Sequence, residues 1–444
     1  WTCDFRKLKC PGRDKTLDNR RIFHITREHN HLPHAFNIEK RLIYKKLKDA
    51  AAVSDETTST IVQSALLNST DTAKANLVSI TNMKRNVQNY RNNAQVPHPL
   101  PYRRNDINIP AELTKNFLLW DSGPTDDRIL IFGTQENIEF LKTCKGISMD
   151  GTFKVVPHLF SQLYTIHGTR LEGLEQTPGK AVPVLFMLLP NKTELTYMRA
   201  FSQIKLLLPG WQPERVMLDF EKAPINAVKA QWPNSAITCC FFHLNQSVWR
   251  KISELGVSKF YGEADENSTC LKMVCALAFV PPEDVLESWN ELILILQPWI
   301  QRQTPEVQNR IDDFSGYFEI NYIGKTIAGV RREPRVAPID LWNVRDRTLQ
   351  KYGRTDNEVE GFHLKVIHAI GAHSPNIWRF MKGLQGLQIE SEKLIVELNS
   401  GVIGRRQRAE YVRLANRISN VTATWQTRQS LYVFLRGISH IFCY

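Results

Sequence analysis

The sequence has no long hydrophobic run. Its longest apolar stretch, AVPVLFMLL at residues 181–189, is the length of a buried strand. A membrane-spanning helix needs about 20 apolar residues, and no basic segment followed by an apolar one stands at the N-terminus. We therefore expect neither a membrane protein nor a signal for secretion. The chain starts at Trp1 rather than at a methionine, and we expect it to be a piece of a longer protein.

Cysteine is also scarce, with 8 among 444 residues and no dense spacing that would indicate a disulfide framework. Such cysteines are typically buried thiols or metal ligands in an intracellular protein. Of the eight, only the pair Cys3 and Cys10 indicates a metal site. A chain of this length is too long for one compact core, so we expect two to four structural units.

Acidic residues are few at both ends of the chain. The first 105 residues carry 19 Lys and Arg against 9 Asp and Glu, and the last 44 carry 7 against 1. Between them lie 31 basic and 35 acidic residues, so the middle is slightly acidic. Basic ends around a separate core favour a protein that binds a polyanion. A solvated surface without a partner is the alternative.

Apolar spacing predicts helices from Asn37 to Arg91, joined by short turns in the manner of a helix-turn-helix unit. The proline-rich segment at 92–106 predicts a linker. Strands are expected at 145–153, 159–169, 181–191, 215–220 and 235–244, with helices between the later ones. This order predicts a mixed α/β sheet covered by helices. A mostly helical stretch follows at 257–350, and another amphipathic helix is expected at 355–371.

Two aspartates stand at the ends of predicted strands: Asp150 in GISMDGTF and Asp219 in RVMLDFEKAP. Acids at the carboxyl ends of neighbouring strands can converge. On the helix at 355–371, Asp356 and Glu360 share a face, while Glu358 points elsewhere. Three converging acids need a cation between them, and oxygen ligands favour Mg²⁺ or Mn²⁺. The alternative is that Asp150 caps a turn before a glycine and Asp219 caps the helix expected at 221–230.

Four ordered segments, MDGTF, VMLDFEKAPINAV, CCFFHL and RTDNEVEGFH, resemble the successive blocks of a Mutator-like element (MULE) transposase over residues 140–370. The resemblance implies an RNase H-like core with a DDE acid triad and an all-helical insertion before the third acid. It assigns Asp150, Asp219 and Glu360 as the catalytic acids, with Asp356 and Glu358 as competitors for the third place.

The third of these segments contains a C-x2-H motif that the family also carries. The resemblance implies that Cys240 and His243 support the acids or contact DNA. A hydrogen-bonded core pair is the alternative, because one cysteine and one histidine do not complete a zinc site. We further expect Glu221 to stabilise the dipole of the following helix, and His363 either to touch phosphate or to be packed within its own helix.

Near the start of the chain, Cys3, Cys10, His29 and His31 have the composition of a tetrahedral zinc site. About 35 residues cannot fold on a hydrophobic core alone, so a structural Zn²⁺ is expected. The pattern resembles a FLYWCH-type zinc finger whose first strand, before Trp1, is missing. His24 and His34 are alternative ligands, and a metal-free basic tail is the alternative structure.

The residues expected to contact DNA phosphates lie in the finger and the helices: Arg6, Lys7, Lys9, Arg13, Lys84, Arg85 and Arg91. The predicted organisation is a partial finger at 1–35, a helical DNA-binding region at 36–92, a linker at 93–110, the core at 111–256 and 351–400, the insertion at 257–350 and a basic helical segment at 401–444.

Together these features predict a DDE-type DNA transposase of the MULE class. It would bind double-stranded DNA at terminal inverted repeats, cleave it with Mg²⁺ or Mn²⁺ and join the 3′ end to target DNA. The resemblance implies a nuclear protein and allows a homo-oligomer. A domesticated, catalytically inactive DNA-binding regulator is the main alternative, and a nuclease acting on RNA or RNA–DNA hybrids is a third.

Overall fold

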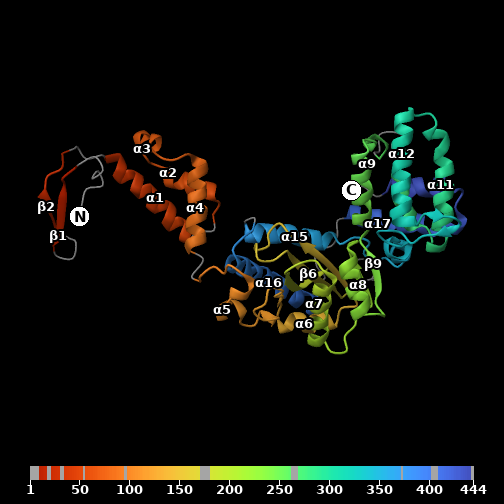
Figure 1. Ribbon diagram of the computed structural model, residues 1–444, viewed down its shortest axis with the longest axis horizontal. Coiled ribbons are helices and arrows are strands. Elements are labelled where there is room, and N and C mark those ends of the chain that lie inside the picture. The colour runs from red at the N-terminus through yellow and green to blue at the C-terminus, as the bar shows by residue number, and fades with distance from the viewer. Residues whose placement is uncertain are drawn as a thin grey trace. The chain divides into compact units, whose positions relative to one another are not determined.

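The computed structural model describes residues 10–17, 22–30, 35–53, 56–94, 98–170, 181–261, 269–371, 374–401 and 409–441. The chain divides into two compact units, Trp1–Pro99 and Leu100–Tyr444 (Figure 1). Their boundary falls within the segment predicted as a linker. None of the helices in the described ranges is long and apolar enough to cross a membrane.

In its described ranges the first unit contains an antiparallel hairpin and four helices. Thr57 and Thr70 cap α2 and α3, each accepting a hydrogen bond from a backbone N–H three residues on. The helices share a small core of their own, whose members include Leu47 on α1 and Val87 on α4. The elements are β1 Arg13–Leu17, β2 Ile22–Arg27, α1 Ala35–Val53, α2 Thr58–Leu66, α3 Asp71–Ala75 and α4 Ile80–Ala94.

The second unit is built on a seven-stranded sheet with the order β3-β4-β7-β6-β5-β8-β9. β5, β6 and β7 form an antiparallel meander, β4 and β3 extend it antiparallel, and β8 and β9 continue from β5 in parallel. The predicted mixed α/β sheet is confirmed, although β3 was not anticipated. The strands are β3 Leu118–Asp121, β4 Leu130–Phe132, β5 Gly146–Thr152, β6 Gln162–Thr169, β7 Val182–Leu189, β8 Arg215–Leu218 and β9 Ala236–Cys239.

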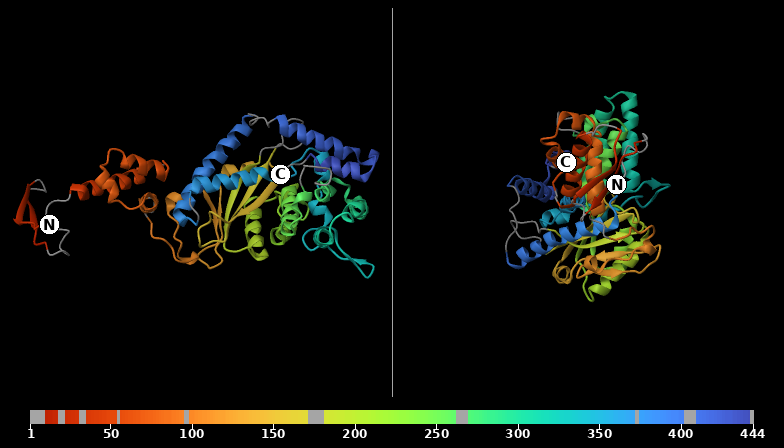
Figure 2. Two further views of the ribbon diagram at one scale, coloured as in Figure 1. Left: turned by 90° about the horizontal axis from the view of Figure 1, so that it is seen from above. Right: turned by 90° about the vertical axis from the view of Figure 1, so that its left-hand side faces the viewer.

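Helices cover both faces of this sheet. Tyr164 of β6 packs edge-on against Tyr197 of α7, with ring centroids 5.1 Å apart. On the opposite face, His167 packs against Phe362 of α15 at the same separation. Figure 2 shows α15 and α16 in blue along one side of the yellow strands. The helices are α5 Ala111–Thr114, α6 Gln135–Lys142, α7 Glu194–Leu207, α8 Lys222–Gln231, α15 Asn357–Ile370 and α16 Ile377–Asn399.

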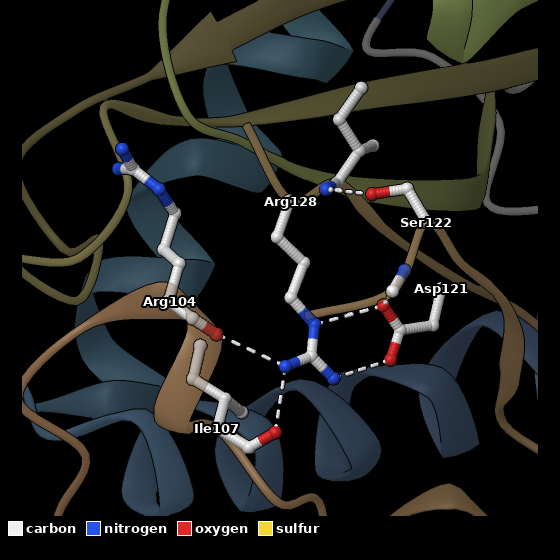
Figure 3. A network of polar contacts seen from close by, with 7 residues as sticks. Arg104, Ile107, Asp121, Ser122 and Arg128 are labelled. Atoms are coloured by element: carbon white, nitrogen blue, oxygen red, sulfur yellow. Dashed lines mark hydrogen bonds and ion pairs between the residues drawn. The ribbon is translucent and has the colours of Figure 1, made fainter. Parts of the chain in front are cut away.

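A buried arginine fastens the outer edge of the sheet to the segment that precedes it (Figure 3). Arg128 is 5% exposed and makes a two-pronged ion pair with Asp121 of β3, at 2.9 and 2.5 Å. The same guanidinium donates to the carbonyl oxygens of Arg104 and Ile107 at 3.0 and 2.7 Å. Because the carboxylate and the two carbonyls together satisfy the charge, a buried arginine is tolerated here.

One predicted strand is partly wrong. The segment 235–244 was expected to be a strand throughout, but β9 ends at Cys239 and helix α9, Phe241–Glu254, begins two residues later. The backbone N–H of Cys240 donates to the carbonyl of Leu218 at 2.8 Å. After this contact the chain leaves the sheet edge, and Phe241 and Leu244 are buried on a helix rather than on a strand. Periodicity over so short an apolar run does not distinguish the two.

The helical insertion also differs from its prediction, because it is not all-helical. A two-stranded hairpin, β10 Thr326–Ile327 and β11 Val330–Arg331, lies between α12 and α13. Its turn residues Ala328 and Gly329 both have positive φ, as two-residue hairpin loops of this type require. The helices are α10 Met273–Ala276, α11 Val285–Ile300, α12 Pro305–Phe318, α13 Ile339–Trp342 and α14 Arg345–Leu349.

The C-terminal helices α17, Ala409–Ala423, and α18, Leu431–Ser439, pack against this insertion. One face of α18 buries Leu431, Phe434, Leu435 and Ile438. Between the two helices, the indole N–H of Trp425 donates to the carboxylate of Asp284 at 2.8 Å. The segment predicted as a basic helical tail therefore supplies part of the insertion's own core.

Candidate active site

Asp150 and Asp219 lie side by side on neighbouring parallel strands. Gly146 of β5 stands opposite Arg215 of β8, and Ser148 stands opposite Met217. Continuing this register brings Asp150 opposite Asp219, one residue past the end of β8. The chain therefore brings two carboxylates, 69 positions apart, to the same edge of the sheet.

Each aspartate also makes a local turn contact. Asp150 Oδ1 accepts the N–H of Gly151 at 2.7 Å, and Asp219 Oδ1 accepts the N–H of Glu221 at 3.0 Å. The N-cap of α8 is Glu221 itself, so Asp219 lies before the helix and not at its N-cap, as the alternative interpretation had it. The side chain of Glu221 makes no capping hydrogen bond. In both aspartates the turn contact occupies one carboxylate oxygen.

Helix α15 brings Glu360 and His363 near the two aspartates. His363 Nδ1 lies 3.5 Å from Asp150 Oδ2, and the charge of Glu360 contributes to the raised pKa of Asp150. The two residues are three apart and share a helix face. Between them, a Cβ built at Gly361 would meet nothing within 4 Å, so the backbone beside Glu360 faces open space.

The three acids of TDNEVEG occupy different environments. Glu358 is exposed and accepts a hydrogen bond from the N–H of Ala181, at the start of β7, so it lies apart from the aspartates. Asp356 is the N-cap of α15, is 3% exposed and is bonded to Cys240. Glu360 is half-buried in the first turn of the helix. Asp356 and Glu360 both act electrostatically on Asp150.

Burial and mutual repulsion dominate the electrostatics of this cluster. Burial, together with the charges of Asp356, Asp219 and Glu360, raises the pKa of Asp150 to about 8. Burial and the charge of Asp356 also raise the pKa of Glu360. Burial and nearby His243 lower the pKa of His363 to about 4, so its ring is neutral at pH 7 and its contact with Asp150 is not an ion pair. The cluster thus has an excess of negative charge that a cation would relieve.

A layer of polar side chains behind the aspartates was not foreseen from the sequence. A Cβ at Gly151 would lie 2.6 Å from Gln162 Oε1, so a side chain at this position would have to displace that amide. The amide of Gln162 donates to the hydroxyl of Tyr197 at 2.7 Å, and this hydroxyl lies 3.4 Å from Glu221 Oε2. These residues come from β6, α7 and the start of α8, and no local spacing connects them.

An exposed aromatic stands next to the acids. Phe153, three residues after Asp150, is 48% exposed. The Lys192 ammonium lies 3.7 Å from the centre of its ring and 3.9 Å from Glu221 Oε2. This cation–π pair presents a flat apolar surface and a positive charge at the edge of the candidate site. Neither residue was singled out from the sequence, because a lone Phe or Lys in a loop carries no periodic signal.

Cys240 and His243 also join the cluster. Cys240 is the N-cap of α9, and its thiol donates to Asp356 Oδ1 at 2.8 Å. His243, in the first turn of α9, interacts electrostatically with both Glu360 and His363. The C-x2-H motif is therefore placed against the start of α15 by a contact that spans 116 positions of sequence.

The predicted zinc ligands are described only in part. Cys10 Sγ and His29 Nδ1 lie 3.5 Å apart, and the thiol accepts the N–H of Gly12 at 3.4 Å. Cys3 and His31 lie outside the described residues, as do the alternative ligand His34 and the basic residues Arg6, Lys7 and Lys9. Of His24 only the backbone, in β2, is described.

The other predicted DNA-contacting residues are described. Arg13 begins β1 and is exposed, and on α4 Arg85 is exposed and Lys84 half-buried. Arg91, near the end of α4, donates to the backbone carbonyl of Glu56 and so links this helix to the turn before α2.

The geometry defines a cluster of carboxylates at the carboxyl end of parallel strands, an arrangement suited to divalent-cation chemistry. Residues 146–247 match the family model of the MULE transposase domain, which supports a transposase-type function. The match covers less than a quarter of the chain, from β5 into α9. It includes Asp150, Asp219 and the C-x2-H motif but stops before Glu360. No curated protein gave a match to this chain.

Proposed function

We propose that this chain is the core of a DDE-type transposase of the MULE class, which cleaves double-stranded DNA and joins its 3′ end to target DNA. The observation that carries the proposal is the convergence of Asp150 and Asp219 on adjacent parallel strands, with Glu360 supplied by a helix that follows the insertion. The order of β5 to β9, an antiparallel meander followed by two parallel strands, supports an RNase H-like core.

The carboxylates fit Mg²⁺ or Mn²⁺. Asp150, Asp219 and Glu360 provide oxygen ligands, and burial together with neighbouring carboxylates raises the pKa values of Asp150 and Glu360. When bound, such ions activate a water or a 3′-hydroxyl and stabilise the leaving oxygen of a phosphodiester.

The surrounding residues have roles that follow from their positions. Neutral His363 holds the Asp150 carboxyl in orientation through its 3.5 Å contact. Phe153 offers a surface on which an unstacked base can lie, and Lys192 adds a positive charge for a phosphate. The open space beside Gly361 leaves room for a duplex next to Glu360.

The first unit would bind the terminal inverted repeats in the nucleus. Arg13, Arg85 and the other basic residues predicted from the sequence would contact phosphates, which position a protein on DNA without reading its sequence. Cys10 and His29, already adjacent, would be two of the four ligands of a structural Zn²⁺ in a FLYWCH-type finger. A homo-oligomer would allow two element ends to be held together.

The experiment tests Asp219 and Glu360, and it compares Glu360 with Glu358 of the same helix. The full chain is incubated with supercoiled plasmid and Mn²⁺, nicking is followed on gels, and Mn²⁺ binding is measured by electron paramagnetic resonance. We expect Asp219→Asn and Glu360→Gln to reduce nicking at least about 100-fold and to weaken Mn²⁺ binding. Glu358→Gln is the matched control and should keep both properties, because Glu358 lies apart from the aspartates.

Wild-type protein that neither nicks the plasmid nor binds Mn²⁺ would refute the proposal. If such protein still binds DNA in a salt-dependent manner, the result would favour the catalytically inactive regulator. Equal nicking by wild type and Glu360→Gln would exclude Glu360 as the third acid.

A further inference from the structure

A thiol, an imidazole and a carboxylate meet where the two ends of the helical insertion come together. Cys240 and His243 lie at the start of α9, and Asp356 lies at the start of α15. One ligand atom from each residue lies within 4.8 Å of the other two. Within the described ranges this is the one group of three or more His, Cys, Asp or Glu side chains whose ligand atoms all lie that close to one another.

Two of the three side chains keep a buried polar atom without a partner. Asp356 is 3% exposed and uses Oδ1 for the thiol of Cys240, but Oδ2 has no hydrogen bond. His243 Nδ1 is likewise buried and without a hydrogen bond. Leaving buried polar atoms unsatisfied costs about 1–3 kcal/mol each, more for a charged group. Unpartnered atoms on side chains that lie this close together are what a ligand set for a cation contains.

We propose that Cys240, His243 and Asp356 bind a divalent transition-metal ion, Zn²⁺, separate from the cations held by Asp150, Asp219 and Glu360. A thiolate with an imidazole favours Zn²⁺ over Mg²⁺, which prefers oxygen ligands. Binding would release the thiol proton of Cys240 to solvent and replace its hydrogen bond to Asp356 with two bonds to the ion. Three protein ligands leave the fourth tetrahedral position to water.

The site would fasten the insertion to the candidate active site. The N–H of Cys240 bonds to Leu218, the residue before Asp219. The carbonyl of Asp356 accepts the N–H of Glu360 at 3.1 Å. An ion shared by Cys240 and Asp356 would therefore fix the second and third acids relative to each other. In this role the three ligands are positioning residues, not catalytic ones.

The test counts metal in the full chain. Each protein is loaded with excess Zn²⁺, desalted and analysed by inductively coupled plasma mass spectrometry. The finger is controlled for by repeating every measurement in a Cys10→Ser background. We expect Cys240→Ser to lose one equivalent of Zn²⁺ in both backgrounds. Cys239→Ser is the matched control: the neighbouring thiol is also buried but donates to the carbonyl of Asp219, so its loss should leave the metal content unchanged.

A second measurement keeps the proposal testable if Cys240→Ser fails to fold. The Cys10→Ser protein is loaded with Co²⁺, and we expect a thiolate-to-cobalt absorption band in the near ultraviolet that Mg²⁺ does not displace. Absence of this band, or equal Zn²⁺ content in the Cys240→Ser and Cys239→Ser proteins, would overturn the proposal. Neither result depends on DNA cleavage, so failure of the transposase proposal would be seen separately.

Discussion

At the scale of single residues, the chemistry of this protein depends on contacts that reach beyond the local sequence. In the local sequence Asp150 is an ordinary aspartate, but the fold brings Asp219, Asp356 and Glu360 near it. Their charges, added to burial, move its pKa to about 8. Gly151 looks like a turn residue, yet it lies within β5, and its lack of a side chain makes room for Gln162.

Asp150 makes the stability of the metal-free protein depend on pH. Between pH 6.5 and 8 the folded state retains a proton on Asp150 that the unfolded state has lost, so the free energy of unfolding falls as pH rises. Below pH 6.5 the lowered pKa values of His167 and His363 act in the opposite direction. We expect a loss of about 1–2 kcal/mol from pH 6.5 to 8 in EDTA.

Tryptophan fluorescence can follow this loss in denaturant titrations, because nine of the ten tryptophans lie in the second unit. Asp150→Asn should flatten the pH dependence, and Mn²⁺ should oppose the loss at pH 8. If the free energy of unfolding changes with pH equally in wild type and Asp150→Asn, the pH dependence does not come from Asp150.

Gly151→Ala should destabilise the second unit by about 1–3 kcal/mol and displace the Asp150 carboxylate, because the new methyl group would overlap Gln162 Oε1. Gln162→Ala should remove most of this penalty in the double variant. Denaturant unfolding of the four proteins gives the coupling energy between the two sites. Strictly additive effects would show that the amide is not the cause.

At the scale of elements, the insertion and the C-terminal helices form one body. Trp425 is 1% exposed, donates to Asp284, and packs edge-on against Phe434 with ring centroids 5.0 Å apart. The guanidinium of Arg428 lies over the same indole. Arg413 and Arg417 on α17 and Arg436 on α18 thus stand on helices whose apolar faces are used for packing.

Trp425→Ala should lower the stability of the second unit by about 3–5 kcal/mol, because it removes a buried indole and leaves Asp284 without its donor. Tyr411→Ala on α17 is the control, since Tyr411 is 59% exposed. Its effect should stay within about 0.5 kcal/mol. Similar midpoints of chemical unfolding for both variants would mean that α17 and α18 do not support the insertion.

At the scale of the whole molecule, the two units have separate cores, and the core of the first is small, with Leu47, Ile61 and Val87 among its members. Stability should therefore be divided between them, since each buries its own apolar surface. No single unfolding free energy then describes the entire chain.

Leu47→Ala should reduce the stability of the first unit by about 2–5 kcal/mol without moving the unfolding transition of the second. Far-ultraviolet circular dichroism reports the helices of both units, whereas tryptophan fluorescence reports mainly the second. Leu42→Ala, at a position of the same helix that is 54% exposed, is the matched control. A fluorescence transition that shifts together with the dichroism would argue against two independent units.

The sequence by itself determined the features that are local or periodic. Apolar runs marked β5, β6, β7 and β8, and three- and four-residue spacing marked α1, α4 and α15. The ordered segments around Asp150 and Asp219 indicated the family that residues 146–247 match. The sequence was not sufficient to predict two local structures. The short apolar run CCFFHL is compatible with both a strand and a helix, and the hairpin of β10 and β11 is too short to show an alternating pattern.

Tertiary structure alone decided which side chains meet. Sheet register brings Asp150 and Asp219 together, although they are 69 positions apart in the sequence. The return of the chain after the insertion brings Cys240 and Asp356 together, although they are 116 positions apart. Asp356 and Glu358 stand two residues apart, yet one is buried against a thiol and the other is exposed beside Ala181. Their difference comes from neighbours on distant segments, and long-range packing of this kind leaves no trace in local spacing.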